Sequence, residues 1–162
     1  MKHLLVSTLL MLLSQIALAD HHKNSIVTQQ IAAAKTFFAL DTRPAEADAL
    51  LHDDFEFVFM GRAQISNVVY TKETFRSVFM NQVFGPLVPQ GFKKIEFIHA
   101  FGDADNVALM AEGDAEGING RYNNSYALIL RFKDGKIHRL NEYASDLLVE
   151  TALYKQQLMP MD

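Results

Sequence analysis

Apolar residues in the first part of the chain recur at the spacing of amphipathic helices. Between residues 26 and 40 the apolar positions are Ile26, Val27, Ile31, Ala34, Phe37 and Phe38. This spacing predicts a helix with one buried face. Pro44 suits the first turn of a second helix ending at Leu51, and Thr71 suits the cap of a third over residues 74–79. We interpret His52-Asp53-Asp54 as a turn.

The rest of the chain has the pattern of strands. After an aromatic strand at residues 55–60, we expect strands at 93–101, 106–117, 121–132 and 136–144. Asn119-Gly120 and Asp134-Gly135 separate the last three and are typical of two-residue hairpin turns. Residues 81–91, which include Pro86 and Pro89, are expected to be a loop, and residues 147–158 a closing helix. The elements together predict one α+β domain.

The predicted turns determine which strand residues share a face. With two-residue turns, one face collects Val107, Leu109, Ala111, Gly113, Leu128, Leu130, Phe132 and Ile137. At one end this face carries polar side chains opposite small residues: Tyr122, Asn124, Tyr126, Asn141 and Tyr143. Small residues that face tyrosines and amides leave room for a ligand and offer it hydrogen bonds. We therefore take these five polar residues as the candidate ligand-binding set.

The opposite face carries a half-apolar stripe of Met110, Ile129 and Leu140, flanked by Glu112, Glu142, Arg131 and His138. Such a stripe is a candidate surface for a homodimer. Two orientations stay open for the 93–101 strand. Counting through its loop turns Glu96 inward, whereas the apolar pattern of Ile95 and Phe97 favours the parity that turns His99 inward.

The first nineteen residues have the three parts of a secretory signal. Lys2 makes the start basic, residues 4–13 are mostly apolar, and Ala17-Leu18-Ala19 places small residues where a signal peptidase reads them. A membrane anchor needs about 20 apolar residues, so this run is too short. We expect cleavage after Ala19, a periplasmic or secreted protein without a membrane anchor, and one domain over residues 20–162 with its core in 24–158.

Composition narrows the classes of partner. Lys2 is the only charged residue among the first nineteen, which leaves 14 basic and 19 acidic residues and a net charge of −5. A mildly acidic chain with scattered charges argues against nucleic acid as a partner. The chain has no cysteine, so burial, chiefly of the 12 phenylalanines, has to stabilise it.

No motif indicates a cofactor or a metal. The sequence lacks a helical histidine pair, a phosphate-binding loop and a nucleophile elbow, so we expect neither group. His21-His22 and the processed N-terminus have the chemistry to hold a metal, but a solvated terminus is the favoured interpretation. We interpret His99 and His138 as ordinary histidines, because no partnered nucleophile is visible.

Three short stretches carry a family resemblance: Tyr122-Asn123-Asn124-Ser125-Tyr126, Asp134-Gly135-Lys136-Ile137 and Glu142-Tyr143. In this order, after helices and an aromatic strand, they resemble the SnoaL-like group of the nuclear transport factor 2-like superfamily, which is related to polyketide cyclases and ketosteroid isomerases. The resemblance implies an α+β cone, a curved antiparallel sheet wrapped on N-terminal helices. It leaves the reaction open, because this fold hosts many activities.

The resemblance places the relatives' catalytic groups on unsuitable residues. The isomerase tyrosine, base and oxyanion acid fall near Thr36 or Phe37, Val58 or Phe59, and Leu128. The cyclase acid is expected just after the Glu-Tyr step, where Ser145 stands and Asp146 comes one residue later. Steroid isomerisation by the relatives' mechanism is therefore not expected.

Asp146 is the one candidate catalytic residue. A carboxylate in an apolar pocket has a raised pKa and serves as a general base; the alternative is that Asp146 or Ser145 caps the last helix. Two functions stay open. The favoured one is a pocket that binds a small carbonyl-containing or apolar ligand without turnover. The other is a lyase, isomerase or cyclase that uses acid–base chemistry in the same pocket.

Overall fold

The computed structural model describes residues 24–159. The predicted signal and its cleavage site after Ala19 lie outside the described residues. Residues 24–38 form the first helix, as the apolar spacing predicts. The elements that follow are α2 (Pro44–Ala49), β1 (Leu51–Met60), β2 (Val69–Thr71), α3 (Lys72–Thr74), the π-helical η1 (Phe75–Phe84), α4 (Gly85–Leu87), β3 (Phe92–Gly102), β4 (Asn106–Gly117), β5 (Gly120–Arg121), β6 (Asn124–Lys133), β7 (Lys136–Tyr143), α5 (Asp146–Leu148) and η2 (Val149–Leu153).

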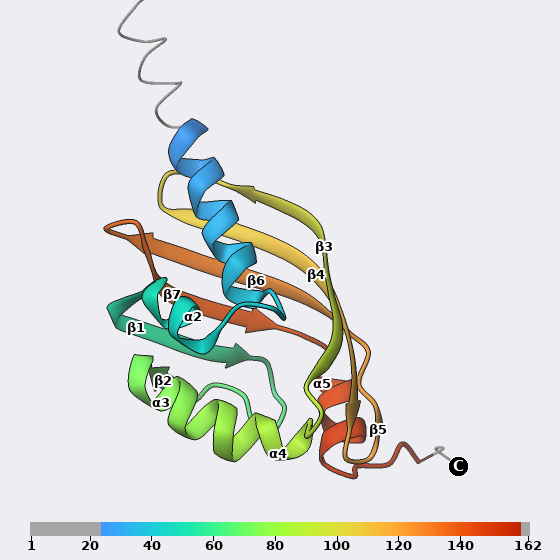
Figure 1. Ribbon diagram of the computed structural model, residues 1–162. Helices are drawn as coiled ribbons and strands as arrows, with labels where there is room; N and C mark the ends of the chain where they lie inside the picture. The colour runs from blue at the N-terminus through green and yellow to red at the C-terminus, as the bar shows by residue number, and fades with distance from the viewer. Residues whose placement is uncertain (1–23, 160–162) are drawn as a thin grey trace, which may run out of the picture.

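The strands form one curved sheet in the order β2-β1-β7-β6-β4-β3, with the short β5 paired to β4. The first helix and α2 lie across one face of this sheet, and the α3–η1–α4 helix runs beside β1 and β2 (Figure 1). The predicted α+β architecture is confirmed. The sheet is mixed rather than wholly antiparallel, because β1 runs parallel to β7. Hairpin signals describe only neighbours in the chain, so they do not reveal this pair.

Aromatic side chains fill the space between the helices and the sheet. Phe55, Phe57 and Phe59 are buried at alternate positions of β1. Phe57 packs against Phe75 and Phe79 of η1, with ring centroids 5.0 and 4.5 Å apart. Ring pairs of this kind stabilise a core beyond the area that they bury. They also hold η1 against the sheet, where it forms one wall of the site described below.

The β4–β6 hairpin differs from the predicted register by two residues. Gly117 pairs with Gly120 and Gly113 with Asn124, so the two-residue turn is Ile118-Asn119 instead of Asn119-Gly120. A shift of two positions leaves every side chain on its predicted face. The inner face predicted for these two strands is therefore confirmed, and all of its residues are buried.

β7 contains a bulge that the turn count did not reveal. The turn at Asp134-Gly135 forms as predicted, with φ angles of 52° and 73°, and Phe132 pairs with Ile137. Arg131 then pairs with Arg139, which leaves His138 as an extra residue in β7. One extra residue moves every later side chain to the opposite face.

This bulge corrects several sequence predictions. Leu140 is fully buried, so it is not part of an exposed dimer stripe, whereas Met110 and Ile129 remain 47% and 37% exposed. Asn141 and Tyr143 face outward instead of joining the polar end of the inner face. The homodimer remains a prediction, now without Leu140.

The helix that begins after Thr71 is longer than predicted. Thr71 Oγ1 accepts a hydrogen bond from the Thr74 backbone N–H at 3.3 Å, which confirms its capping role. The helix then continues through η1 and α4, so residues 81–87 are helical rather than a loop. Pro86 stands in the last turn of this continuous helix, one residue before its end at Leu87. His52-Asp53-Asp54, predicted as a turn, belongs to β1.

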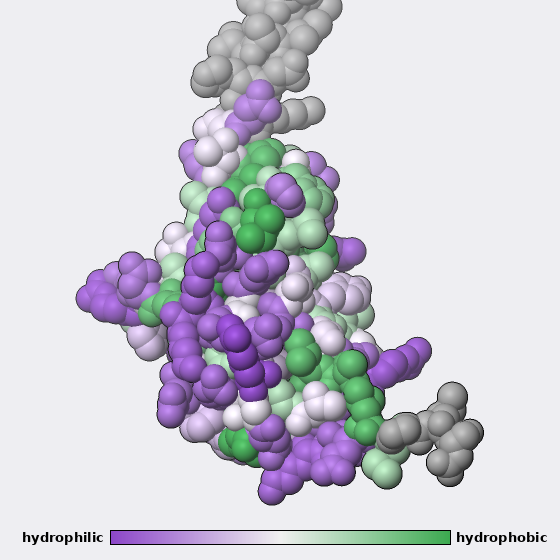
Figure 2. All heavy atoms as spheres, turned by 90° about the vertical axis from the view of Figure 1, so that its right-hand side faces the viewer, coloured by the Kyte–Doolittle hydropathy of each residue, from purple (hydrophilic) through white to green (hydrophobic). Residues whose placement is uncertain are grey.

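β3 forms one edge of the sheet. The parity favoured by the apolar pattern of Ile95 and Phe97 is correct as far as Phe97, but it does not continue to His99. Ile95, Phe97 and Ala100 pair with inner-face residues of β4, and an irregularity after Phe97 changes the parity. Glu96 and His99 are consequently both exposed. The side of the molecule shown in Figure 2 is mainly hydrophilic, with its hydrophobic residues in separate areas. Each helix within residues 24–159 is too short or too polar to cross a membrane.

Candidate functional site

A cavity of about 260 Å³ lies between the helices and the concave face of the sheet. Apolar side chains dominate its wall, and among the described residues Arg76 and Glu142 are its only charged lining groups. The apolar part of the wall is Phe37, Phe38, Leu40, Pro44, Ala47, Phe75, Phe79, Met80, Phe84, Phe92, Ile95 and Leu140. A smaller cavity of about 50 Å³ shares Phe38, Phe92, Ile95 and Glu142 with the first and adds Tyr126.

Glu142 lies where the two cavities meet. The bulge at His138 turns its side chain inward, and in the sheet it stands between Phe59 of β1 and Leu128 of β6. Within residues 24–159 no hydrogen-bond donor or cation pairs with its carboxyl group. Burial raises the pKa of the Glu142 carboxyl from its ordinary value of 4.5 to about 7. Near neutral pH this group can therefore both take up and release a proton.

Two tyrosines of the inner face lie near this carboxyl group. The hydroxyl groups of Tyr122 and Tyr126 are buried and find no hydrogen-bond partner among the described residues. Burial, with a smaller effect of the Glu142 charge, raises the pKa of Tyr122 to about 12. Burial also raises the pKa of Tyr126 well above its ordinary value, with smaller effects of Tyr122 and Glu142. Both hydroxyls therefore stay protonated and can donate hydrogen bonds.

Asn124, the third inner-face candidate, has a structural contact. It is 2% exposed, and its Oδ1 accepts a hydrogen bond from the Ser145 backbone N–H at 3.0 Å. Its Nδ2 is buried without a partner in the described part of the chain. Asn124 thus ties the start of β6 to the connection between β7 and α5.

The other charged lining residue, Arg76, is already neutralised. Its Nη2 and Nε donate to Asp48 Oδ1 at 2.7 and 3.3 Å, and Nη2 also donates to the Pro44 carbonyl at 3.3 Å. These bonds tie η1 to α2 at the wall of the cavity. Glu142 is consequently left as the lining group without a counter-charge.

The candidate base Asp146 lies outside this cavity. Ser145, not Asp146, is the N-cap of α5, and its Oγ accepts the Leu148 backbone N–H at 3.4 Å. The Asp146 Oδ2 accepts the Arg62 backbone N–H at 2.8 Å and so holds the segment after β1. The capping interpretation is therefore correct for Ser145, and Asp146 has a structural contact of its own.

Of the five predicted ligand-binding residues, the structure brings three together. Tyr122, Asn124 and Tyr126 lie buried on the inner face. Asn141 accepts a hydrogen bond from Arg139 Nε at 3.2 Å, and Tyr143 is 44% exposed; neither lines the cavity.

Sequence reasoning missed Glu142, the residue best placed for chemistry, because it placed this side chain on the outer face. One signal was available. A face that exposes Leu140 is less favourable than one that buries it, and burying Leu140 turns Glu142 inward as well.

No protein-family model matches this sequence, and no curated protein matches it. Solved structures match over most of the chain. A candidate isomerase from Bacillus subtilis has a TM-score of 0.67 at 18% identity, over 83% of this chain and 99% of the other. An NTF2-like protein from Burkholderia xenovorans LB400 has a TM-score of 0.62 at 13% identity, over 78% of this chain and 97% of the other.

The chain has the nuclear transport factor 2-like fold. A candidate SnoaL-like polyketide cyclase from Jannaschia sp. CCS1 shares this fold, with a TM-score of 0.63 at 16% identity over 82% of this chain and 96% of the other. The predicted resemblance is thereby confirmed at the level of the fold. At such identities the reaction has to be argued from the residues of the site.

The position of Glu142 in the sheet can be compared with the positions that the resemblance gives for the relatives' catalytic groups. The resemblance assigned the isomerase base to the neighbourhood of Val58 or Phe59 and the oxyanion acid to that of Leu128. Glu142 pairs with Phe59 on one side and Leu128 on the other. The inner face therefore carries a carboxyl group on β7, between these two positions.

Proposed function

We propose that this protein is a small-molecule enzyme in which Glu142 transfers a proton of a carbonyl compound bound in the cavity. The observation that carries the proposal is a carboxyl group with a pKa of about 7 at the junction of the two cavities, without a cation or donor among the described residues to hold it ionised. A general base is most effective when its pKa lies near the working pH. Binding without turnover was the favoured prediction because no convincing base had been placed in the pocket.

The reaction is proton abstraction next to a carbonyl group. The ionised Glu142 carboxylate takes the proton from the α-carbon, the electron pair moves onto the carbonyl oxygen, and an enolate forms. Tyr126 lines the smaller cavity, and its buried hydroxyl, which has no hydrogen-bond partner among the described residues, donates a hydrogen bond to that oxygen. Where the enolate is conjugated with a double bond, return of the proton from Glu142 to its far carbon completes an isomerisation. Alternatively, the enolate carbon attacks a second carbonyl group, whose oxygen takes up the proton from Glu142, and this completes a cyclisation.

Two further features support this reaction class. The mainly apolar wall lowers the local dielectric around the developing oxyanion, which strengthens the hydrogen bond to it. The fold is also that of the candidate isomerase and candidate polyketide cyclase described above. Neither reaction requires a bound cofactor.

The test is deuterium exchange at the α-carbon of small aryl and cyclic ketones in D₂O, followed by NMR. We expect exchange by the wild-type protein and a loss of roughly 100-fold or more in Glu142→Gln, the usual contribution of a general base. Asp146→Asn is the matched control and should leave exchange unchanged, because Asp146 lies outside the cavity. Retention of ketones without any exchange would refute the enzymatic role and favour simple ligand binding.

We further propose that the enzyme works outside the cytoplasm, after cleavage behind Ala19. The basic start, apolar run and Ala17-Leu18-Ala19 support this proposal. The intact mass of protein recovered from the periplasm or medium of an expressing bacterium should correspond to residues 20–162. Recovery of the full 162-residue chain from the cytoplasm would contradict it.

A further inference from the structure

Two irregularities of the sheet meet at His138. Between β1 and β7 the pairs are Leu51 with Ile137 and then Glu56 with Arg139, so four residues of β1 lie opposite His138 alone. On the other side of β7, the same residue is the extra one against β6. Bulges re-aim side chains, and they recur next to functional sites.

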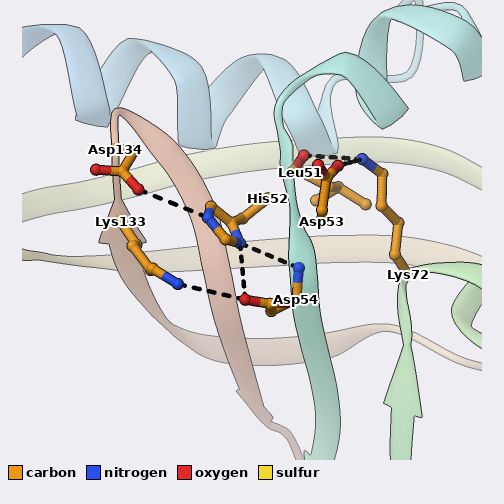
Figure 3. A network of polar contacts seen from close by, with 7 residues as sticks. All are labelled: Leu51, His52, Asp53, Asp54, Lys72, Lys133 and Asp134. Atoms are coloured by element: carbon orange, nitrogen blue, oxygen red, sulfur yellow. Dashed lines mark hydrogen bonds and ion pairs between the residues drawn. The ribbon is translucent and has the colours of Figure 1, made fainter.

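This distortion brings two histidines from distant parts of the chain together. The rings of His52 and His138 lie edge to face, with centroids 5.4 Å apart. The His52 imidazole lies between two carboxylates, Asp54 on its own strand and Asp134 in the β6–β7 turn (Figure 3). His52 Nδ1 is 3.8 Å from Asp54 Oδ2, and its Nε2 is 3.7 Å from Asp134 Oδ2.

We propose that His52, His138 and Asp54 bind a divalent transition-metal ion such as Zn²⁺. One ligand atom from each of the three lies within 4.8 Å of the other two. Donor atoms about 2.0–2.2 Å from a common zinc ion lie roughly 3–4 Å apart. Side-chain rotations that move the donor atoms by about an ångström would therefore bring all three into coordinating distance of one ion. Two imidazoles and a carboxylate suit Zn²⁺, Ni²⁺ or Co²⁺ rather than Ca²⁺ or Mg²⁺.

The negative charges around His52 favour the binding of a cation. Asp54 and Asp134 both lie beside the His52 ring, and Lys133 is the one cation paired with Asp54 among the described residues. None of the three proposed ligands lines the cavity of Glu142. The metal site is therefore separate from the proposed active site and stands independently of the reaction proposed there.

Two present contacts compete with the metal. Lys133 Nζ donates to Asp54 Oδ2 at 3.3 Å, and the Asp54 backbone N–H donates to His52 Nδ1 at 3.0 Å (Figure 3). A metal bound through these two atoms displaces both donors. The backbone N–H of the exposed Asp54 then turns to water at little cost. Removal of Lys133 should therefore strengthen metal binding, whereas removal of any ligand should weaken it.

The bound ion would connect the start of β1 to β7. A ligand that binds only the folded state raises the unfolding temperature in proportion to the logarithm of its concentration. We therefore expect Zn²⁺ to raise the Tm of this protein in a manner that depends on His138.

The processed chain is titrated with Zn²⁺ by calorimetry. It is also titrated with Co²⁺, because bound Co²⁺ can be followed by its visible spectrum. His21→Ser and His22→Ser are introduced into every sample, because those side chains offer a separate metal site with the processed N-terminus. We expect one equivalent to bind, and affinity to fall more than about tenfold in His138→Gln. His99→Gln, which changes an exposed histidine of β3, is the matched control and should bind as before.

Two further variants keep the test decisive if His138→Gln fails to fold. Asp54→Asn alters an exposed ligand and should weaken binding without unfolding the chain. Lys133→Met should tighten binding several-fold, an effect opposite to that of a damaged fold. No binding of either ion, or binding that none of these three substitutions changes, would overturn the proposal.

Discussion

The ionisation of Glu142 creates a pH-dependent cost of folding that can be measured without any substrate. In the unfolded chain this carboxyl group has its ordinary pKa of 4.5, and in the folded protein burial raises the pKa to about 7. The folded state therefore binds the proton more tightly. Protonation of Glu142 therefore stabilises the folded state relative to the unfolded state. This stabilisation is fully present below pH 4.5 and is lost as the pH rises through about 7.

The size of this effect follows from the two pKa values. Each tenfold change in proton affinity corresponds to about 1.4 kcal/mol, so a pKa of about 7 against 4.5 gives an upper value of about 3 kcal/mol. Solvent reaches part of the Glu142 side chain through the cavity, which lowers the expectation to about 2 kcal/mol. Glu142→Gln removes the charge while it keeps the shape of the side chain.

The assay is urea denaturation of both proteins between about pH 4.5 and pH 8.5. We expect the free energy of unfolding of Glu142→Gln, relative to wild type, to rise by about 2 kcal/mol across this range. Glu112→Gln, on the exposed outer face of β4, is the control and should show no such trend. A Glu142→Gln difference that stays constant with pH would refute the inward, desolvated placement of Glu142.

Three stability measurements by urea denaturation test the remaining structural statements. Leu140→Ala should cost about 2–5 kcal/mol, whereas Ile129→Ala on the outer face should change stability by no more than about 0.5 kcal/mol; equal effects would contradict the bulge in β7. Ser145→Ala removes the N-cap of α5 and should cost about 1 kcal/mol, and an unchanged stability would argue against that cap. Gly113→Ala would place a Cβ 2.8 Å from a ring atom of Phe92, so we expect a loss of about 1–3 kcal/mol; a stabilised variant would show that the ring has room to move.

Local patterns in the sequence predicted most elements of the fold. The spacing of apolar residues located the first helix, and the capping chemistry of Thr71 located the start of the third. Period-two alternation located the strands of the second half, with β4 matching residues 106–117. The inner face of β4 and β6 was also correct, because a register error of two residues leaves side chains on the same face.

The candidate site depended on a feature that alternation does not encode. A single extra residue, His138, turns Glu142 into the cavity and turns Asn141 and Tyr143 out of it. Apart from the preference for burying Leu140, nothing in the local sequence marks this bulge. It forms where β7 pairs with β1 on one edge and β6 on the other, and the partner β1 lies about eighty residues away in the chain.

The sequence by itself thus determined the class of fold, the longer strands and the burial of Tyr122 and Tyr126, since these follow from interactions between residues close together in the chain. Only the tertiary structure decided which carboxyl group lies in the cavity and that His52 meets His138. Both outcomes depend on strand pairing between distant segments. Such pairing is set by the packing of the whole sheet, in which burial of Leu140 outweighs the desolvation of one glutamate.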